Sequence, residues 1–129
     1  MILMEYHNPV LLKESVDGLN INPDGVYVDV TFGGGGHTQA LLESSEDAEV
    51  VSLDCDPDAG IRAESVAEKY GERFRFYDLS FQCLDDASSE GEFDGILFDL
   101  GISSFQLAEA EKGFSFRLDA PLDMRLNPR

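Results

Sequence analysis

Four consecutive glycines, Gly33 to Gly36, constrain the fold most, because they separate a β-branched run at residues 26–30 from an alanine- and leucine-rich stretch that begins near Thr38. A glycine loop between a strand and a helix lets backbone N–H groups approach a ligand closely, since no side chain intervenes. Ordering four glycines costs backbone entropy, which weighs against a plain flexible turn. The sequence therefore predicts a strand, a ligand-binding loop and a helix in succession, as in α/β proteins.

The same alternation continues along the chain. Further strands are expected at residues 49–53, 73–77 and 93–98, and a short polar helix at 82–88. The helix after the second strand has Asp56 as its N-cap, Pro57 as its first residue and Gly71 at its end. Right-handed crossovers between parallel strands then predict the strand order 3-2-1-4, the first part of a doubly wound Rossmann-like sheet.

The segments at the two ends are less regular. Asn8 as cap and Pro9 as first residue predict a helix before the first strand, with Leu12, Val16 and Leu19 on its apolar face. Beyond residue 101 the periodicity ends, and residues 112–129 read as an ordered loop or the opening of another element.

The charge of the chain limits its partners more than its length does. Its 129 residues fit one domain, but 26 acidic against 9 basic residues give a net charge of -17. A surface of this sign repels a phosphate backbone, so a docking surface for nucleic acid would have to lie elsewhere. Solubility and adaptation to high salt are simpler explanations of the acidity than an acidic binding face.

The two cysteines, Cys55 and Cys83, have neither the paired spacing of a disulfide framework nor a histidine partner for zinc, so no metal site is expected. This cysteine usage fits a reducing cytoplasm. The sequence contains no apolar run of about eighteen residues and no basic region followed by an apolar one, so neither a membrane span nor export is expected.

Carboxylates end three of the four expected strands, at Asp54, Asp78 and Asp99. Ligands of doubly wound sheets bind beyond these carboxyl ends. Asp54 follows the glycine loop by about twenty residues, the place where an acidic side chain accepts hydrogen bonds from both ribose hydroxyls of a nucleoside. A helix cap is the competing interpretation for Asp54, but Asp56 is better placed for that role.

The glycine run does not match the dinucleotide pattern, because the last required glycine falls on Thr38 or Gln39. A nucleotide-dependent oxidoreductase is therefore disfavoured, and the loop suits the carboxylate tail of a nucleoside-linked amino acid equally well. Asp78 is as consistent with an acceptor for an adenine amino group as with a solvated carboxylate. Phe81 can cover an adenine face, although aromatic residues at such positions more often belong to the core.

Asp99 lies at the end of the fourth expected strand, opposite Asp54, where a cofactor and a substrate would meet. It is therefore the natural centre of a reaction. Ser103 and Gln106 have the spacing of a capping box, so Gln106 is also explained as a helix cap.

Seven strings along the chain resemble successive signatures of the ribosomal RNA small subunit methyltransferase H family. They occupy residues 5–14, 24–33, 35–37, 54–57, 94–104, 113–116 and 121–125. The strings most specific to the family are aspartate-leucine-glycine-isoleucine-serine-serine at 99–104 and proline-leucine-aspartate-methionine-arginine at 121–125. Departures from the family pattern occur at Gly34, where a long polar side chain is usual, at Cys55, where arginine is usual, and at Asp78, which matches no family feature.

The resemblance implies a class I methyltransferase sheet, of which residues 1–129 form the N-terminal half, with a helical inserted domain and the remaining strands absent. It implies transfer of a methyl group from S-adenosylmethionine to N4 of a cytosine in small-subunit (16S) ribosomal RNA. The cofactor contacts that it implies are Gly35, Gly36, His37, Asp54, Phe81, Asp99 and Gln106. Asp99 is the one catalytic candidate, and no general base is assigned.

Two alternatives remain open, namely a fragment that binds the cofactor without catalysis and a nucleotide-dependent oxidoreductase. The expected partner is the RNA of the small ribosomal subunit, with no membrane partner. The outer edge of the fourth strand is expected to be open, which would favour a homodimer through that edge. This chain alone is expected not to methylate RNA, because it lacks a basic docking surface and the remaining strands of the sheet, and its charge opposes the encounter.

Overall fold

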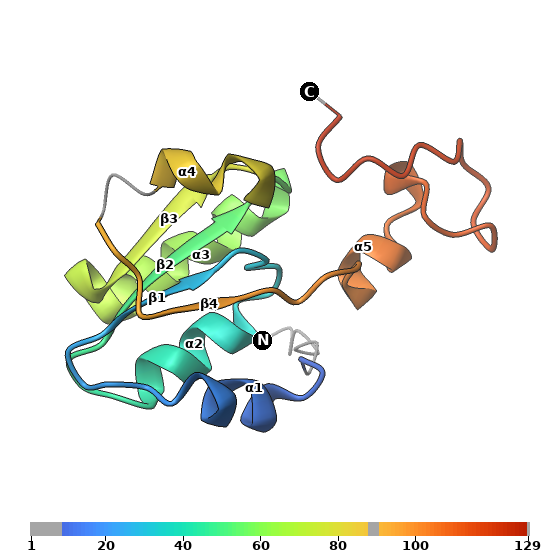
Figure 1. Cartoon of the computed structure of the whole chain (residues 1–129). Helices are drawn as coiled ribbons and strands as arrows, with labels where there is room; N and C mark the ends of the chain where they lie inside the picture. Colours follow the sequence, from blue (N-terminus) through green and yellow to red (C-terminus); the bar gives the residue numbers. More distant parts are fainter. Residues whose placement is uncertain (1–8, 88–90, 129) are drawn as a thin grey trace.

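A computed structural model describes residues 9–87 and 91–128 of the chain. Its centre is a four-stranded parallel sheet in the order β3-β2-β1-β4 (Figure 1), which confirms the predicted order. The strands are β1 (Val26–Asp29), β2 (Glu49–Asp54), β3 (Phe74–Asp78) and β4 (Gly95–Leu97). All three strand pairs are parallel, so all four carboxyl ends meet at one edge of the sheet.

Helices and short 3-10 turns connect the strands. The helices are α1 (Leu12–Leu19), α2 (Gly36–Glu43), α3 (Pro57–Tyr70), α4 (Leu84–Ala87) and α5 (Ser104–Ala108), and the turns are Gly71–Arg73, Phe81–Cys83 and Ala110–Lys112. The limits of α3 agree with the sequence. The Asp56 side chain accepts a hydrogen bond from the Asp58 N–H at its start, and Gly71 ends it with a φ of 59°.

The sheet buries apolar side chains on both faces, because successive residues of a strand point to opposite sides. One face carries the larger core, which includes Tyr27 and Val50 from the strands and Leu41 and Val66 from α2 and α3. The opposite face carries a smaller cluster of five buried residues, with Ala87 as its contribution from α4. The sheet is thus well covered on the α2 and α3 side and more lightly covered on the other.

Two helix starts near the chain's beginning differ from those expected. The first helix begins at Leu12 rather than after Asn8, which lies outside the described residues. Pro9 is not helical, because it packs over Gly36 so closely that a Cβ there would lie 2.3 Å from the proline Cγ. Helix α2 begins at Gly36 rather than near Thr38, since Gly35 adopts a φ of 83° and starts the helix early.

The third strand begins one residue later than expected because Arg73 belongs to a 3-10 turn. Its guanidinium donates hydrogen bonds to the carbonyls of Leu42 and Ala48 at 2.7 and 3.1 Å, which holds it outside the ladder. The expected helix at 82–88 divides into the turn Phe81–Cys83 and α4, and its last residue lies outside the described residues.

Strand β4 is shorter than the expected 93–98 and spans Gly95–Leu97. Its ladder ends because the Asp99 N–H donates to the Thr31 side-chain oxygen at 2.8 Å rather than to a strand carbonyl. The chain then runs away from the sheet through α5 and a tail with little regular structure (Figure 1). None of the helices described here is long and apolar enough to cross a membrane.

Candidate functional site

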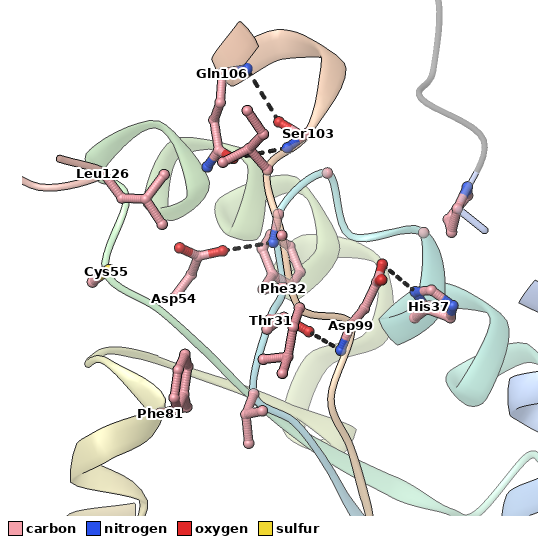
Figure 2. A pocket seen from close by; sticks show the side chains of 18 of the residues that line it. Thr31, Phe32, His37, Asp54, Cys55, Phe81, Asp99, Ser103, Gln106 and Leu126 are labelled. Atoms are coloured by element: carbon pink, nitrogen blue, oxygen red, sulfur yellow. Dashed lines mark hydrogen bonds and ion pairs between the residues drawn. The ribbon is translucent and has the colours of Figure 1, made fainter. Parts of the chain in front are cut away.

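A cavity of about 260 Å³ lies beyond the carboxyl ends of the strands. It is lined by residues that follow each strand, such as Thr31 after β1, Cys55 after β2, Phe81 after β3 and Leu100 after β4. Among the seven cofactor contacts expected from the sequence, the ones that line it are Gly36, His37, Asp54, Phe81, Asp99 and Gln106. Figure 2 shows the side chains grouped around this space.

The glycine loop is ordered by its own hydrogen bonds. The Gly35 N–H donates to the carbonyl of Phe32 at 2.8 Å, and the Gly33 N–H donates to a carboxylate oxygen of Asp54 at 2.7 Å. Gly35 does not line the cavity, and its conformation explains why it must be glycine. Its φ of 83° disfavours other residues, and a Cβ would lie 2.9 Å from the Phe32 ring.

Asp54 ends β2 and is held from two sides. Its Oδ2 accepts the Gly33 N–H, and its Oδ1 accepts the Asp56 N–H at 2.9 Å. Burial raises the pKa of Asp54 above the ordinary 3.8, although both hydrogen bonds act in the opposite direction. Each carboxylate oxygen can accept about two hydrogen bonds, so each keeps capacity for one more donor from the cavity.

The predicted capping box of α5 is present. The Ser103 N–H donates to Gln106 Oε1 at 2.9 Å, and the Gln106 N–H donates to Ser103 Oγ at 3.2 Å. Gln106 is buried, and its Nε2 also donates to Asp56 Oδ2 at 2.8 Å. Gln106 therefore caps α5, joins it to the start of α3 and lines the cavity at once.

His37 and Asp99 face each other across the cavity wall (Figure 2), with Nδ1 of His37 3.5 Å from Oδ2 of Asp99. The histidine side chain is buried, whereas 41% of the Asp99 side chain is exposed. The sequence nominated Asp99 from its strand-end position and His37 from the family resemblance. The structure brings both to the same side of the cavity, at the end of β4 and the start of α2.

Phe81 lines the cavity, and the Phe98 ring lies edge-on to it at 6.2 Å. Phe81 is 43% exposed, so its interpretation as a core aromatic residue is wrong. Asp78 pairs in register with Asp54 across β2 and β3, but its exposed side chain does not line the cavity. The solvated interpretation of Asp78 therefore outweighs the ligand-binding one.

A buried polar network below the glycine loop was missed from the sequence. Asp29 is fully buried in β1, accepts a hydrogen bond from the Thr38 hydroxyl at 2.7 Å and accepts the Thr31 N–H at 3.1 Å. The Thr38 and Ser52 hydroxyls lie 2.7 Å apart. Burial raises the pKa of Asp29, while its hydrogen bonds to Thr38 and Thr31 partly oppose that rise. The only sequence signal was one aspartate inside a β-branched run.

The cavity has a distinctive charge. Its charged lining residues are Asp54 and Asp99, and no lysine or arginine is among the described residues that line it. Dinucleotide phosphates are bound by backbone N–H groups of the glycine loop in such sheets, but here the Gly33 and Gly35 N–H groups are used within the protein, so this cavity with two carboxylates suits a ligand with positive charge. Burial raises the pKa of the Cys55 thiol, which leaves it without the thiolate that nucleophilic catalysis needs. No group of three or more potential metal ligands occurs among the described residues.

Comparison with known proteins gives a consistent group of relatives. A family model described as the MraW methylase family matches residues 4–129. The ribosomal RNA small subunit methyltransferase H proteins of Cyanothece sp. and Christiangramia forsetii are 49% and 50% identical to the chain over 95% and 98% of its length. These matches cover 41% and 42% of the relatives, so the chain spans about two fifths of their length.

Among solved structures, an rRNA methylase from Streptococcus thermophilus is 23% identical with a TM-score of 0.49. The match covers 57% of this chain and 45% of that protein. A likeness of this size does not bear on function.

The hydrogen bond between the Thr38 hydroxyl and Asp29 can be tested by mutation. At a pH above the folded-state pKa of Asp29, Thr38→Val should lower the free energy of unfolding by about 1–3 kcal/mol, because the buried carboxylate loses the donor supplied by the Thr38 hydroxyl. Because burial raises the folded-state pKa of Asp29 above 3.8, ionisation opposes folding, and this cost appears as the pH rises through that pKa. The loss in Thr38→Val should therefore shrink as the pH falls toward 3.8.

Urea denaturation at several pH values measures both effects. Ser65→Ala is the matched control, because it removes an exposed hydroxyl that donates to the Arg62 carbonyl. Its small effect should not change with pH. A loss in Thr38→Val of constant size across the pH range would show that Asp29 is not the group this hydroxyl stabilises.

Proposed function

We propose, because this chain belongs to the MraW methylase family, that it binds S-adenosylmethionine in the cavity beyond the strand ends. We further propose that it forms part of a methyltransferase acting on N4 of a cytosine in small-subunit (16S) ribosomal RNA. The names of its relatives support an RNA methyltransferase. A substrate of this kind implies a cytoplasmic protein that acts on the small ribosomal subunit or its RNA.

The charge of the cavity carries the proposal of the cofactor. S-adenosylmethionine has a sulfonium cation and an ammonium group but no phosphate, whereas nicotinamide dinucleotides bring two phosphates. The described lining has two carboxylates, and the Gly33 and Gly35 N–H groups that could hold phosphates are bonded within the protein, which favours the first ligand over the second. The same observation disfavours the nucleotide-dependent oxidoreductase.

The residues present fit the parts of this cofactor. Asp54 keeps acceptor capacity on both oxygens, which suits the two ribose hydroxyls. Phe81 offers an exposed ring for the adenine face. Two of the loop amides, of Gly33 and Gly35, are already used within the protein. The first turn of α2, where helix N–H groups lack intrahelical partners, is the remaining place for a carboxylate tail.

The chemistry needs positioning more than proton transfer. The exocyclic amine of cytosine is a weak nucleophile, so its nitrogen must be held in line with the methyl group that S-adenosylmethionine supplies when bound. Asp99, or the carbonyls of Leu100 and Gly101, can accept hydrogen bonds from that amine at the cavity mouth. The Asp99 backbone is fixed by its hydrogen bond to Thr31, and His37 faces its carboxylate. No general base is assigned.

Asp54 provides the most direct test of the cofactor. Replacing its carboxylate with an amide in Asp54→Asn should weaken binding of S-adenosylhomocysteine at least about tenfold, because charged hydrogen bonds contribute about 1.5–3 kcal/mol each. Isothermal titration calorimetry measures the dissociation constant, with NAD titrated in parallel and expected not to bind.

The matched control is Asp78→Asn, which removes the register partner of Asp54 outside the cavity. Its affinity should stay within about twofold of the parent chain. Equal affinities of the Asp54 and Asp78 variants would remove the ribose assignment, and preferential binding of NAD would favour the oxidoreductase.

Methyl transfer tests the proposed substrate. We expect the 129-residue chain to bind the cofactor but not to methylate small ribosomal subunits, because its net charge of -17 opposes encounter with RNA. A chain extended to the length of its curated relatives should transfer labelled methyl groups to a cytosine amine, as digestion of the RNA to nucleosides and chromatography would show. Comparable turnover by both chains would contradict the expectation that the charge of residues 1–129 prevents catalysis.

Self-association through β4 is a further proposal. This strand pairs with β1 on one side, and no described strand pairs with its other side, where Ile96 is 41% exposed. The chain should dimerise with rising concentration, and Ile96→Lys should shift the equilibrium toward the monomer, because charge on an edge strand discourages pairing. Sedimentation velocity measures this, with Ile61→Lys on α3 as the control. If the two variants behave alike, the β4 edge is not the interface.

A further inference from the structure

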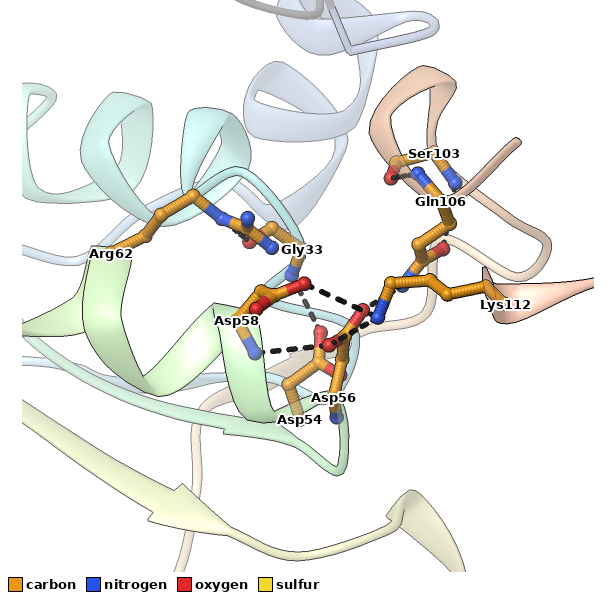
Figure 3. Close-up of polar contacts among 8 residues, drawn as sticks. All are labelled: Gly33, Asp54, Asp56, Asp58, Arg62, Ser103, Gln106 and Lys112. Atoms are coloured by element: carbon orange, nitrogen blue, oxygen red, sulfur yellow. Dashed lines mark hydrogen bonds and ion pairs between the residues drawn. The ribbon is translucent and has the colours of Figure 1, made fainter. Parts of the chain in front are cut away.

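A charged cluster at the start of α3 connects segments that are distant in sequence (Figure 3). Nζ of Lys112 lies 2.9 Å from Oδ1 of Asp56 and 3.2 Å from Oδ2 of Asp58. Asp56 Oδ2 accepts the Gln106 amide at 2.8 Å, and Asp56 Oδ1 also caps the Asp58 N–H. The Asp56 side chain is 1% exposed and that of Lys112 is 15% exposed, so this ion pair is largely shielded from water.

The same lysine also organises the tail that follows α5. The Met124 N–H donates to the Lys112 carbonyl at 2.9 Å, which folds the tail back beside the lysine. Gly113 makes this close return feasible, since a Cβ there would lie 2.2 Å from the Asp123 backbone nitrogen. As a result, Leu126 reaches the cavity and lines it.

Apolar burial contributes little to holding this tail against the sheet. Large apolar side chains along it remain exposed, including Phe116 at 90%, Leu118 at 37%, Leu122 at 61% and Met124 at 59%. Attachment therefore depends on polar contacts. The largely buried ones are the contacts of Asp56 with Gln106 and Lys112.

Asp56 and Lys112 do not line the cavity, but the segment that they hold does. Gln106 and Leu126 line the cavity beside Asp54 (Figure 2). The N–H of Asp56 also donates to the Asp54 carboxylate, so the charged cluster is joined to Asp54 by a direct hydrogen bond. Opening the cluster would remove a wall of the cavity without altering any residue of the glycine loop.

We propose that the ion pair of Lys112 with Asp56 is a latch that positions residues 101–126 as one wall of the cofactor cavity and thereby sets cofactor affinity. Lys112 and Asp56 are positioning residues in this scheme, since neither touches the cavity. The affinity part of the proposal rests on the proposed binding of S-adenosylmethionine. The part that concerns the segment itself stands on the contacts alone.

The electrostatics agree with a closed latch. Burial alone would raise the pKa of Asp56, but hydrogen bonds from Gln106, Lys112 and the Asp58 N–H together hold it below 3.8. Partial burial disfavours the charge of Lys112, yet its contacts with the two aspartates hold its pKa above 10.5. Both groups are therefore charged at neutral pH.

The test uses Lys112→Met, which keeps most of the aliphatic stem and removes the ammonium group. If this variant leaves the latch closed in about a tenth of molecules, the dissociation constant of S-adenosylhomocysteine rises about tenfold. Amide hydrogen exchange in 101–126 should accelerate, because its rate rises with the open fraction, while exchange in β1 and β2 stays unchanged. Lys112→Arg keeps the charge and the reach, and should restore both readouts to near the parent values.

The matched control is Lys69→Met, which removes a lysine of α3 from an exposed ion pair with Glu43 of α2. Its affinity and exchange should both match the parent chain. Faster exchange without weaker binding would overturn the role in affinity, and unchanged exchange in 101–126 would overturn the latch itself. Failure of Lys112→Arg to restore either readout would also overturn it, because charge would not be the cause.

A second variant separates loss of the latch from unfolding of the whole chain. Lys112→Met leaves Asp56 as an unpaired buried charge, which can destabilise the whole chain. Combining it with Asp56→Asn removes that charge and retains a capping oxygen for α3, and the combined variant should show a folded sheet, fast exchange in 101–126 and weaker binding. Slow exchange in the combined variant would contradict the latch. If the parent chain itself does not bind S-adenosylhomocysteine, the proposed cofactor fails, while hydrogen exchange still decides whether the latch exists.

Discussion

The carboxylate of Asp54 is the point on which the geometry of the cavity depends. One oxygen accepts the Gly33 N–H and the other accepts the Asp56 N–H, so a single side chain fixes both the glycine loop after β1 and the turn that begins α3. Arg62 supports the same loop from α3 through its hydrogen bond to the Gly33 carbonyl at 2.8 Å. Because these loops are already ordered, the free energy of ligand binding is not reduced by the entropy cost of ordering them.

Local patterns predicted the parts of the site that depend on short distances along the chain. The spacing of Ser103 and Gln106 predicted reciprocal capping, and the position of Asp54 after the second strand placed it in the cavity. The strand order also followed from simple alternation. Contacts between distant residues were different. Asp29 with Ser52 through the Thr38 hydroxyl, and Asp56 with Lys112 at a separation of 56 residues, leave no periodic signal.

Boundaries were mispredicted where a tertiary contact overrode a local preference. Asn8 and Pro9 have the sequence pattern of a helix start, yet Pro9 packs against Gly36 and is not helical. The apolar run ending at Phe98 would extend β4, but the Asp99 N–H bonds to the Thr31 side chain. Pro9, Thr31 and Asp99, which make these two contacts, line the cavity, where loop position matters more than regular structure.

The acidic charge of the chain affects binding of RNA and binding of the cofactor differently. A net charge of -17 disfavours a polyanion but is no obstacle to a cofactor with a sulfonium and an ammonium group. The lining carries two carboxylates, and Lys112, in the segment that leads to the cavity residue Leu126, is paired with Asp56 and Asp58. The latch therefore has an electrostatic consequence besides its mechanical one, because it keeps this positive charge paired and out of the cavity.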